Sequence, residues 1–296
     1  MTPDELADAV PALIGHRPEA HLLAVRSTSS GMNSVTVAVT LSLGSFVAKW
    51  VPARDGEALR RGALAAHDMA AGGLRAGPPL VLGDGGLTSP LAGGEVVLLE
   101  EVPGVPLTAD DDDQAAWGAA LGRAHRIAPR PERDPFFAWL DFEGTHPARE
   151  GWVSDAAARV LEESRAVDGI SWVQLHTDPA PDAFLRDDSG GVGVIDWTGS
   201  VPGPALYDVA SAVMYAGGPA RATPFLDAYR ASSGLPTVEI DQHLDTFRRF
   251  RALVQAVYFS IRIARADLTG VTSHAENTVG LQDARDMLRD LDVLTS

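Results

Sequence analysis

Residues 175–185 read LHTDPAPDAFL, and residues 194–197, a short distance further on, read VIDW. The first stretch overlaps the end of the strand-like run SWVQLHTD at 171–178. Asp178 is therefore expected at the point where a strand ends and a loop begins. The second stretch ends another apolar run at Asp196, eighteen residues after Asp178. A His-x-Asp triplet alone is a weak indication, because a chain of this composition contains about one by chance. Two aspartates that each follow a strand are the more informative pattern.

A turn of small residues connects these two aspartates. The strand-like runs FLRDD at 184–188 and VGVIDW at 192–197 flank Ser189-Gly190-Gly191, which predicts a hairpin. This hairpin would return Asp196 to the side of Asp178, and two carboxylates at neighbouring strand ends suit an acid–base group and a metal ligand. The alternative is that both are loop aspartates that bind nearby backbone N–H groups.

Lysine occurs once in the chain. Of the 24 basic residues, 23 are arginine, and the lysine is Lys49 in the run SFVAKWV at 45–51. An ammonium group is a compact point charge that suits a phosphate where a wide guanidinium group would not fit. The apolar neighbours of Lys49 argue against an incidental surface lysine. The sequence therefore predicts a phosphate-binding role for Lys49.

The chain changes character near Pro103-Gly104. Strand-like runs dominate before this point, and helical patterns dominate after it, apart from the strands within 171–197. Outside that segment, we expect strands at 21–28, 34–41, 45–51, 80–84 and 95–102. We expect helices at 3–14, 56–72, 154–166, 206–216, 223–232, 240–266 and 275–292. One more helix is expected after the aspartates at 110–113. This order predicts an α+β chain of two lobes, a small mostly β lobe at 1–102 and a larger mostly helical lobe at 103–296.

Composition excludes several classes of site. No cysteine occurs, so disulfides, zinc–thiolate sites and thiol nucleophiles are excluded. The chain lacks a signal-peptide pattern and any apolar run of roughly 18 residues, so we expect a cytoplasmic protein with no membrane partner. The net charge is −16, and most of it lies after residue 106. Nucleic acid is therefore not expected as a partner, whereas a cationic small substrate would be attracted; general solubility is the alternative explanation of the charge.

The segments together resemble those of the aminoglycoside phosphotransferase and choline kinase superfamily, with some likeness to the second class of homoserine kinases. The stretch at 175–185 resembles the catalytic loop His-Gly-Asp-x-x-x-x-Asn, VIDW resembles the magnesium-binding segment, and VAKW at 47–50 resembles the strand with the phosphate-binding lysine. LLEEVPG at 98–104 resembles the linker that binds adenine, LGRAH at 121–125 a helix that ends in Leu-His, and LYDVASAV at 206–213 the Asp-Leu-Ala segment.

This resemblance covers roughly residues 20–215, in the right order. It implies a bilobal protein-kinase-like fold. It also implies a small-molecule kinase that uses ATP or GTP with Mg²⁺ and phosphorylates a hydroxyl of an antibiotic, an amino sugar or an amino alcohol.

The resemblance also implies a role for each matching residue. Asp178 would orient the attacking hydroxyl as catalytic base, with His176 as its partner in the catalytic loop. Asp196 would bind magnesium, and Asp208 would brace the loop. Contacts to the nucleotide are expected from Lys49, from the Glu100 carbonyl and the Val102 N–H, and from Ser30 and Gly31 in the loop at 29–33. That loop lacks a Gly-x-Gly-x-x-Gly pattern, so an ordinary hairpin loop is an equal alternative.

Two positions depart from the family pattern. The asparagine of the catalytic loop is Ala183 here, and a methyl group cannot bind a metal; Asp182 beside it would supply an oxygen, or is an ordinary loop residue. The glutamate that the family pairs with its lysine some 16 residues later is Ala65 here. Glu57 is the nearest acid in the helical stretch, and we expect it to orient Lys49.

A second functional class is therefore open: a degenerate kinase fold that binds a nucleotide or ligand without turnover. The missing asparagine and glutamate favour it, whereas Lys49, Asp178 and Asp196 favour activity, because a pure binding module does not need Asp178. Two further features are expected to be structural. His125 would be a packed histidine, and the arginines on the helix at 240–266 would form a solvated or ion-paired face.

Overall fold

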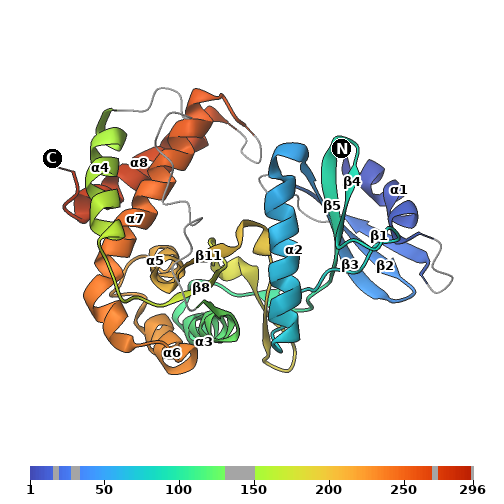
Figure 1. Ribbon diagram of the computed structural model, residues 1–296, viewed down its shortest axis with the longest axis horizontal. Coiled ribbons are helices and arrows are strands. Elements are labelled where there is room, and N and C mark those ends of the chain that lie inside the picture. Colours follow the sequence, from blue (N-terminus) through green and yellow to red (C-terminus); the bar gives the residue numbers. More distant parts are fainter. Residues whose placement is uncertain (16–19, 28–33, 131–150, 269–272, 295–296) are drawn as a thin grey trace.

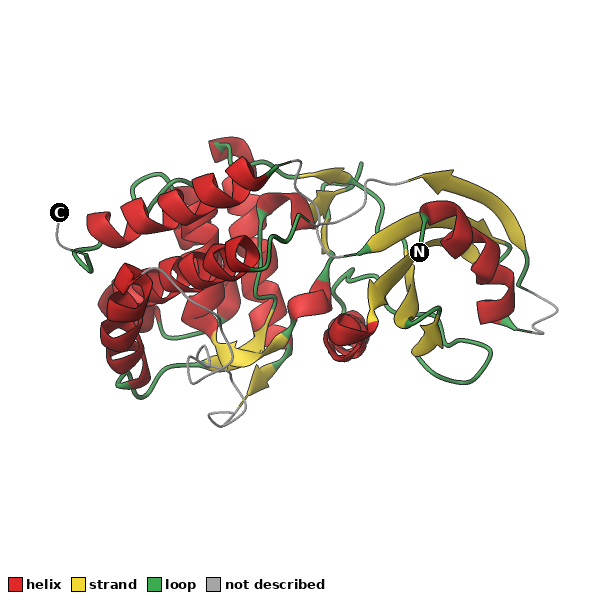
Figure 2. Cartoon of the chain, turned by 90° about the horizontal axis from the view of Figure 1, so that it is seen from above, coloured by secondary structure: helices red, strands yellow, loops and turns green. Residues whose placement is uncertain are grey.

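The computed structural model describes residues 1–15, 20–27, 34–130, 151–268 and 273–294. A five-stranded sheet lies at one end of the molecule and most of the helices lie at the other, with helix α2 (Gly56–Ala71) between them (Figure 1). The same division is visible from above (Figure 2). The predicted order of a β-rich part followed by a helical part is confirmed, while the boundary at residues 102–103 remains a prediction.

The N-terminal sheet is antiparallel and has the strand order β1-β2-β3-β5-β4. Alternate side chains of a strand face opposite sides of the sheet. Val37 and Val39 pack with α1 (Pro3–Ile14) on one side, whereas Val97 packs with α2 on the other. Lys49 is in register with Val97 and so lies on the α2 side. The strands are β1 (Leu22–Ser27), β2 (Val35–Leu41), β3 (Gly44–Pro52), β4 (Thr88–Leu91) and β5 (Gly94–Glu100).

One predicted strand is wrong. Residues 80–84 do not form a strand; Leu80 N–H donates to Leu98 O, but Leu82 N–H donates back to Gly86 O across a tight turn. The glycines at 83, 85 and 86 allow this turn, which ends the extended segment after one contact with β5. The edge strand of the sheet is instead β4, further along the chain.

The remainder of the chain is mostly helical. Its helices are α3 (Asp111–Ile127), α4 (Gly151–Arg165), α5 (Ala205–Tyr215), α6 (Thr223–Ser233), α7 (Thr237–Ala264) and α8 (His274–Asp290). No helix in the described ranges is both long and apolar enough to cross a membrane. The main core centres on Trp117 of α3, whose ring contacts Phe225 of α6 and Phe184 of the β hairpin.

Two small sheets carry the loops of interest. One has the order β10-β9-β6 and the other β11-β8-β7. The predicted hairpin is confirmed, because Val192 of β10 is in antiparallel register with Arg186 of β9. Their strands are β6 (Val105–Pro106), β7 (Pro129–Arg130), β8 (Trp172–Leu175), β9 (Phe184–Arg186), β10 (Val192–Val194) and β11 (Val201–Pro204).

The hairpin is attached to the segment that follows α2. Val194 N–H donates to Arg75 O at 2.8 Å, and the Arg75 guanidinium pairs with Asp187. This pairing, together with hydrogen bonds from Ser189, lowers the pKa of Asp187 well below its usual range. The strand that leads to Asp196 is therefore connected to the segment that follows α2.

Candidate active site

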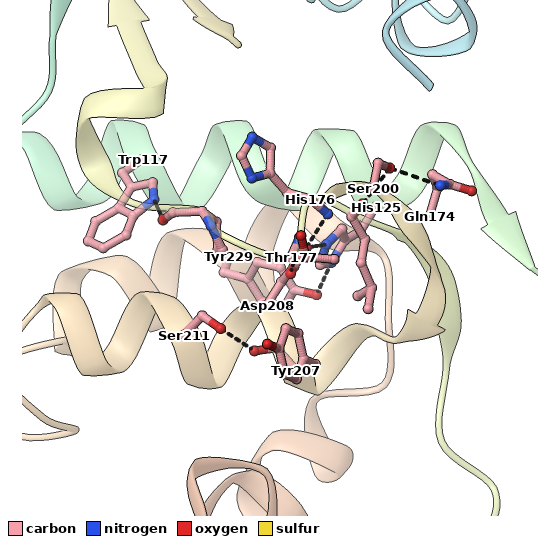
Figure 3. A network of polar contacts seen from close by, with 12 residues as sticks. Trp117, His125, Gln174, His176, Thr177, Ser200, Tyr207, Asp208, Ser211 and Tyr229 are labelled. Carbon is pink, nitrogen blue, oxygen red and sulfur yellow. Dashed lines mark hydrogen bonds and ion pairs between the residues drawn. The ribbon is translucent and has the colours of Figure 1, made fainter. Parts of the chain in front are cut away.

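Asp208 of α5 holds the loop that follows β8. Its carboxylate is fully buried and accepts hydrogen bonds from His176 N–H at 2.6 Å and Thr177 N–H at 2.8 Å (Figure 3). His125 Nε2 lies 3.1 Å from the same carboxylate, and the other ring nitrogen of His125 contacts the Tyr229 hydroxyl. A buried carboxylate needs such donors to offset its desolvation. The contacts agree with the bracing role expected for Asp208 and with the packed histidine expected at 125.

Thr177 has a left-handed backbone, with φ of 76°. A β-branched residue is strained in this region, which glycine adopts freely. The motif that the loop resembles has glycine at this position. The two hydrogen bonds that Asp208 accepts hold the loop in this conformation and aim the next residue, Asp178, away from the core.

His176 lies inside the fold. It is only 2% exposed, and its Nε2 donates to Ile195 O at 2.7 Å. This hydrogen bond connects the loop of Asp178 to the residue that precedes Asp196. The predicted side-by-side placement of the two aspartate segments is thereby confirmed. A catalytic part for His176 stays a prediction.

Asp178 is exposed and has two neighbours that the sequence did not indicate. Its side chain is 67% exposed, its Oδ1 accepts a hydrogen bond from the Tyr215 hydroxyl, and the Arg251 guanidinium lies 3.7 Å from the same oxygen. Of the two alternatives for the arginines of this helix, Arg251 is ion-paired and not solvated, because its side chain is 11% exposed. The carboxylate of Asp178 thus contacts a hydroxyl donor from α5, Tyr215, and a cation from α7, Arg251.

Lys49 and Asp196 form an ion pair between the sheet and the helical part. Lys49 Nζ lies 2.5 Å from Asp196 Oδ1, and the Thr198 hydroxyl donates to the same oxygen at 3.1 Å. Desolvation raises the pKa of Asp196, but the charge and hydrogen bond of Lys49 outweigh it, so that this pKa lies below its usual value. Asp196 has a left-handed backbone, with φ of 63°, and its side chain remains 58% exposed.

Helix α2 supplies no acid to Lys49. Ala65 is buried, and Glu57 pairs with Arg60 at 3.1 Å and Arg61 at 3.6 Å instead of Lys49. The expectation for Glu57 thus differs from the structure, because the first turn of α2 places this side chain among arginines of its own helix. Asp196 occupies the place of the missing partner in this conformation.

Gly62 brings α2 into direct contact with the Asp196 segment. A Cβ atom at Gly62 would lie 2.5 Å from Trp197 O and 2.6 Å from Thr198 Cα. Because both are backbone atoms, no side-chain rotation can relieve the overlap, and only glycine allows α2 to approach this closely.

We predict that Gly62→Ala lowers turnover by about 10- to 100-fold, because the added methyl pushes the Asp196 segment from its position. The measurement is turnover at saturating nucleotide together with thermal unfolding. Gly280→Ala is the matched control, since its Cβ would overlap the Phe259 ring at 2.3 Å between α8 and α7. Equal losses of activity in the two variants would show that Gly62 has no special connection with the site.

The linker after β5 presents backbone groups of the expected kind. Within the described part of the chain, Val102 N–H has no hydrogen-bond partner. Glu100 N–H donates to Pro78 O, and a Cβ atom at Gly77 would lie 2.8 Å from Glu100 O. The remaining predicted nucleotide contacts, Ser30 and Gly31, lie outside the described residues.

Asp182 lies in the short helical turn Pro181–Ala183 and is exposed. The adjacent Ala183 O accepts a hydrogen bond from Ile195 N–H at 2.9 Å, so this turn borders the Asp196 segment. Among the described residues, no three His, Asp or Glu side chains are grouped closely enough to hold a metal ion by themselves.

A cavity of about 230 Å³ lies between α5, α7 and the end of α8. Arg251 lines this cavity and also contacts Asp178, so its side chain separates the cavity from the exposed carboxylate. The wall combines charged and apolar groups: Arg248, Arg251 and Asp290 with Met214, Met287, Leu291 and small residues of α5 and α7.

Comparisons with known proteins place the chain in a family and show structures of similar fold. Residues 25–250 match the model of the phosphotransferase enzyme family. Among solved structures, an amicoumacin kinase in complex with AMP-PNP, Ca²⁺ and Ami is similar, with a TM-score of 0.71 and 18% identity over 97% of this chain and 93% of that chain. No curated protein sequence matches the chain.

Two further solved structures have the same fold. A microcompartment-associated aminopropanol kinase gives a TM-score of 0.65 and 16% identity over 98% of this chain and 96% of that chain. A spectinomycin phosphotransferase in complex with ADP and spectinomycin gives 0.63 and 11% over 98% of both chains. These likenesses confirm the predicted α+β, kinase-like fold.

Proposed function

The chain belongs to the phosphotransferase enzyme family, and on that premise we propose that it transfers the γ-phosphate of ATP or GTP to a hydroxyl group of a small molecule. The observation that carries the proposal is the convergence of three segments. Lys49 of the sheet pairs with Asp196, and Ile195 beside it accepts a hydrogen bond from His176, two residues before Asp178. These contacts support one site with a cation for phosphates and two exposed carboxylates, the groups that phosphoryl transfer requires.

We assign the nucleotide to the side of the sheet on which Lys49 lies. The base would lie against the linker, where the Glu100 carbonyl and the Val102 N–H offer one acceptor and one donor. The phosphates would reach Lys49 of β3, whose mostly buried side chain carries a compact point charge. Ser30 and Gly31 remain candidates for additional phosphate contacts.

The residues present fit a magnesium ion that is bound together with the nucleotide. Asp196 keeps one carboxylate oxygen without a partner among the described residues, and its side chain is exposed. Magnesium in kinases is commonly held by one or two carboxylates, substrate phosphates and water. Asp196 would be its main protein ligand, with Asp182 or water in place of the family asparagine. Bound there, the ion would neutralise charge on the transferred phosphoryl group.

In the proposed reaction, the acceptor hydroxyl attacks the γ-phosphorus while the bond from that phosphorus to the bridging oxygen breaks and the nucleoside diphosphate leaves. Asp178 orients the hydroxyl and accepts its proton. Lys49 holds the phosphates of the donor in place. The exposure of Asp178 is required for this role, because the carboxylate must reach the acceptor directly.

The test of this function is a transfer assay with magnesium and ATP or GTP across amino sugars, nucleosides, macrolides and amino alcohols. We expect nucleoside diphosphate and a phosphorylated acceptor in equal amounts, with only slow hydrolysis when the acceptor is omitted. Nucleotide binding without transfer to any acceptor would instead favour a degenerate, ligand-binding protein.

We further propose that the acceptor occupies the cavity beside Arg251. Its two arginines and one aspartate suit a molecule that carries both an anionic and a cationic group better than a purely cationic one. Arg248→Ala should then raise the KM for the acceptor about tenfold and leave the KM for the nucleotide unchanged. Arg230→Ala is the control, because Arg230 pairs with Asp227 and Asp241 on α6 and α7 and does not line the cavity. An unchanged acceptor KM in Arg248→Ala would place the acceptor elsewhere.

A further inference from the structure

We propose that Tyr215 and Arg251 are positioning residues that hold one oxygen of Asp178, so that the other oxygen is presented to the acceptor. This inference rests on the proposed function and adds two residues to it. Both groups approach Oδ1: the Tyr215 hydroxyl donates to it, and the Arg251 guanidinium lies 3.7 Å from it. Oδ2 has no partner among the described residues.

This division of the carboxylate matters for the chemistry. A free aspartate side chain rotates about χ2, which is a broad torsion, and would exchange its two oxygens. A donor fixed on one oxygen removes that freedom and leaves the lone pairs of the other oxygen for the acceptor hydroxyl. Orientation of this kind accounts for large rate effects, since a displacement of about 1 Å can cost 10²-fold.

Arg251 is itself held rigidly. Its Nε donates to the Ser211 hydroxyl at 3.0 Å, and that hydroxyl donates to Tyr207 O at 2.9 Å (Figure 3 shows this second bond). Burial lowers the pKa of Arg251, but Tyr207, Tyr215 and Asp178 together raise it above its usual value. The guanidinium group is therefore a permanent cation with a fixed place between α5 and α7.

Tyr215 acts as a donor at every working pH. Burial and the neighbouring charge of Asp178 raise the pKa of its hydroxyl, so the proton stays on Tyr215 and the hydrogen bond to Asp178 persists. A charge-assisted O–H bond to a carboxylate is among the stronger hydrogen bonds in proteins. The last turn of α5, which is braced through Asp208, thus also orients Asp178.

The test is Tyr215→Phe, which removes the hydroxyl and keeps the ring. We expect the turnover number to fall about tenfold while the KM for nucleotide and the midpoint of thermal unfolding stay close to wild type. Tyr258→Phe is the matched control, since its hydroxyl is 3.1 Å from the buried Arg262 and is not in contact with Asp178; it should keep full turnover. Full turnover in Tyr215→Phe would overturn the inference.

A double variant separates positioning from packing. If Tyr215 acts only through the carboxylate, Tyr215→Phe should have no further effect in an Asp178→Ala background, which has no side-chain oxygen to hold, whereas independent effects would multiply. Arg251→Met should lower turnover about 100-fold, and Arg251→Lys should recover part of that loss by restoring the charge. Multiplying effects would refute positioning through Asp178. The proposed function itself fails only if the wild type transfers phosphate to no acceptor. That outcome is distinct from both possible results of the double variant.

Discussion

Replacing Asp178 by asparagine should lower the turnover number by about 10²–10⁴, the usual contribution of a general base. The substitution keeps the shape of the side chain and its ability to accept a hydrogen bond from Tyr215, but it removes the charge and the proton-accepting oxygen. Nucleotide affinity should change little, because in the proposed function Asp178 serves the acceptor and Lys49 binds the phosphates. Turnover and nucleotide binding, measured on the same preparation, separate the two effects.

Asp188→Asn is the matched control for this experiment. Asp188 is exposed in the turn of the β9–β10 hairpin, so its substitution removes the same charge at a distance from the loop of Asp178. We expect wild-type turnover in this variant. If Asp178→Asn retained wild-type transfer, Asp178 would not be the base, and the loop would be a structural remnant of the family motif.

The sequence predicted the parts of the site that are local in the chain. Asp178 and Asp196 each follow a short apolar strand, and a small-residue turn between them predicts the hairpin that brings their segments together. Lys49 could be identified because it is the single lysine and lies in an apolar run. In each case, short-range patterns determine the geometry, and the patterns are visible in a few residues.

The neighbours of Asp178 could not be predicted in this way. Tyr215 is 37 residues from Asp178 along the chain, and Arg251 comes from a helix further on. Several arginines follow one another on α7, and nothing in their spacing distinguishes Arg251, whose guanidinium is buried against Ser211, from Arg248, which pairs with Asp245. Their different roles arise from the packing of α5 against α7, which is a tertiary property.

Glu57 shows the opposite failure, in which a local argument suggested a contact that the fold does not make. Distance along the sequence made it the nearest acid to Lys49, but one turn of helix directs it to Arg60 and Arg61. The close approach of α2 at Gly62 brings the Asp196 segment to Lys49 instead. The missing family glutamate therefore does not leave Lys49 without a carboxylate partner in this structure.

Replacing Asp196 by alanine should abolish magnesium-dependent transfer, and it should also change nucleotide binding in a direction that depends on the metal. In the structure Asp196 pairs with Lys49 at 2.5 Å, so the phosphates of an incoming nucleotide compete with this carboxylate for the ammonium group. Without metal, Asp196→Ala should bind the nucleotide more tightly than the wild type, because a negative charge is removed and Lys49 is released. With magnesium, the wild type should bind more tightly, because Asp196 then holds the ion.

The measurement is a titration of both proteins with ATP, in EDTA and in magnesium. Lys49→Ala is the companion variant: it should weaken nucleotide binding under both conditions, and Lys49→Arg should not restore it, because a guanidinium fork does not replace a point charge. Asp182→Ala should raise the magnesium requirement only if Asp182 completes the shell. Weaker binding of metal-free nucleotide by Asp196→Ala would contradict the competition for Lys49, and normal magnesium dependence of transfer in that variant would remove Asp196 from the metal site.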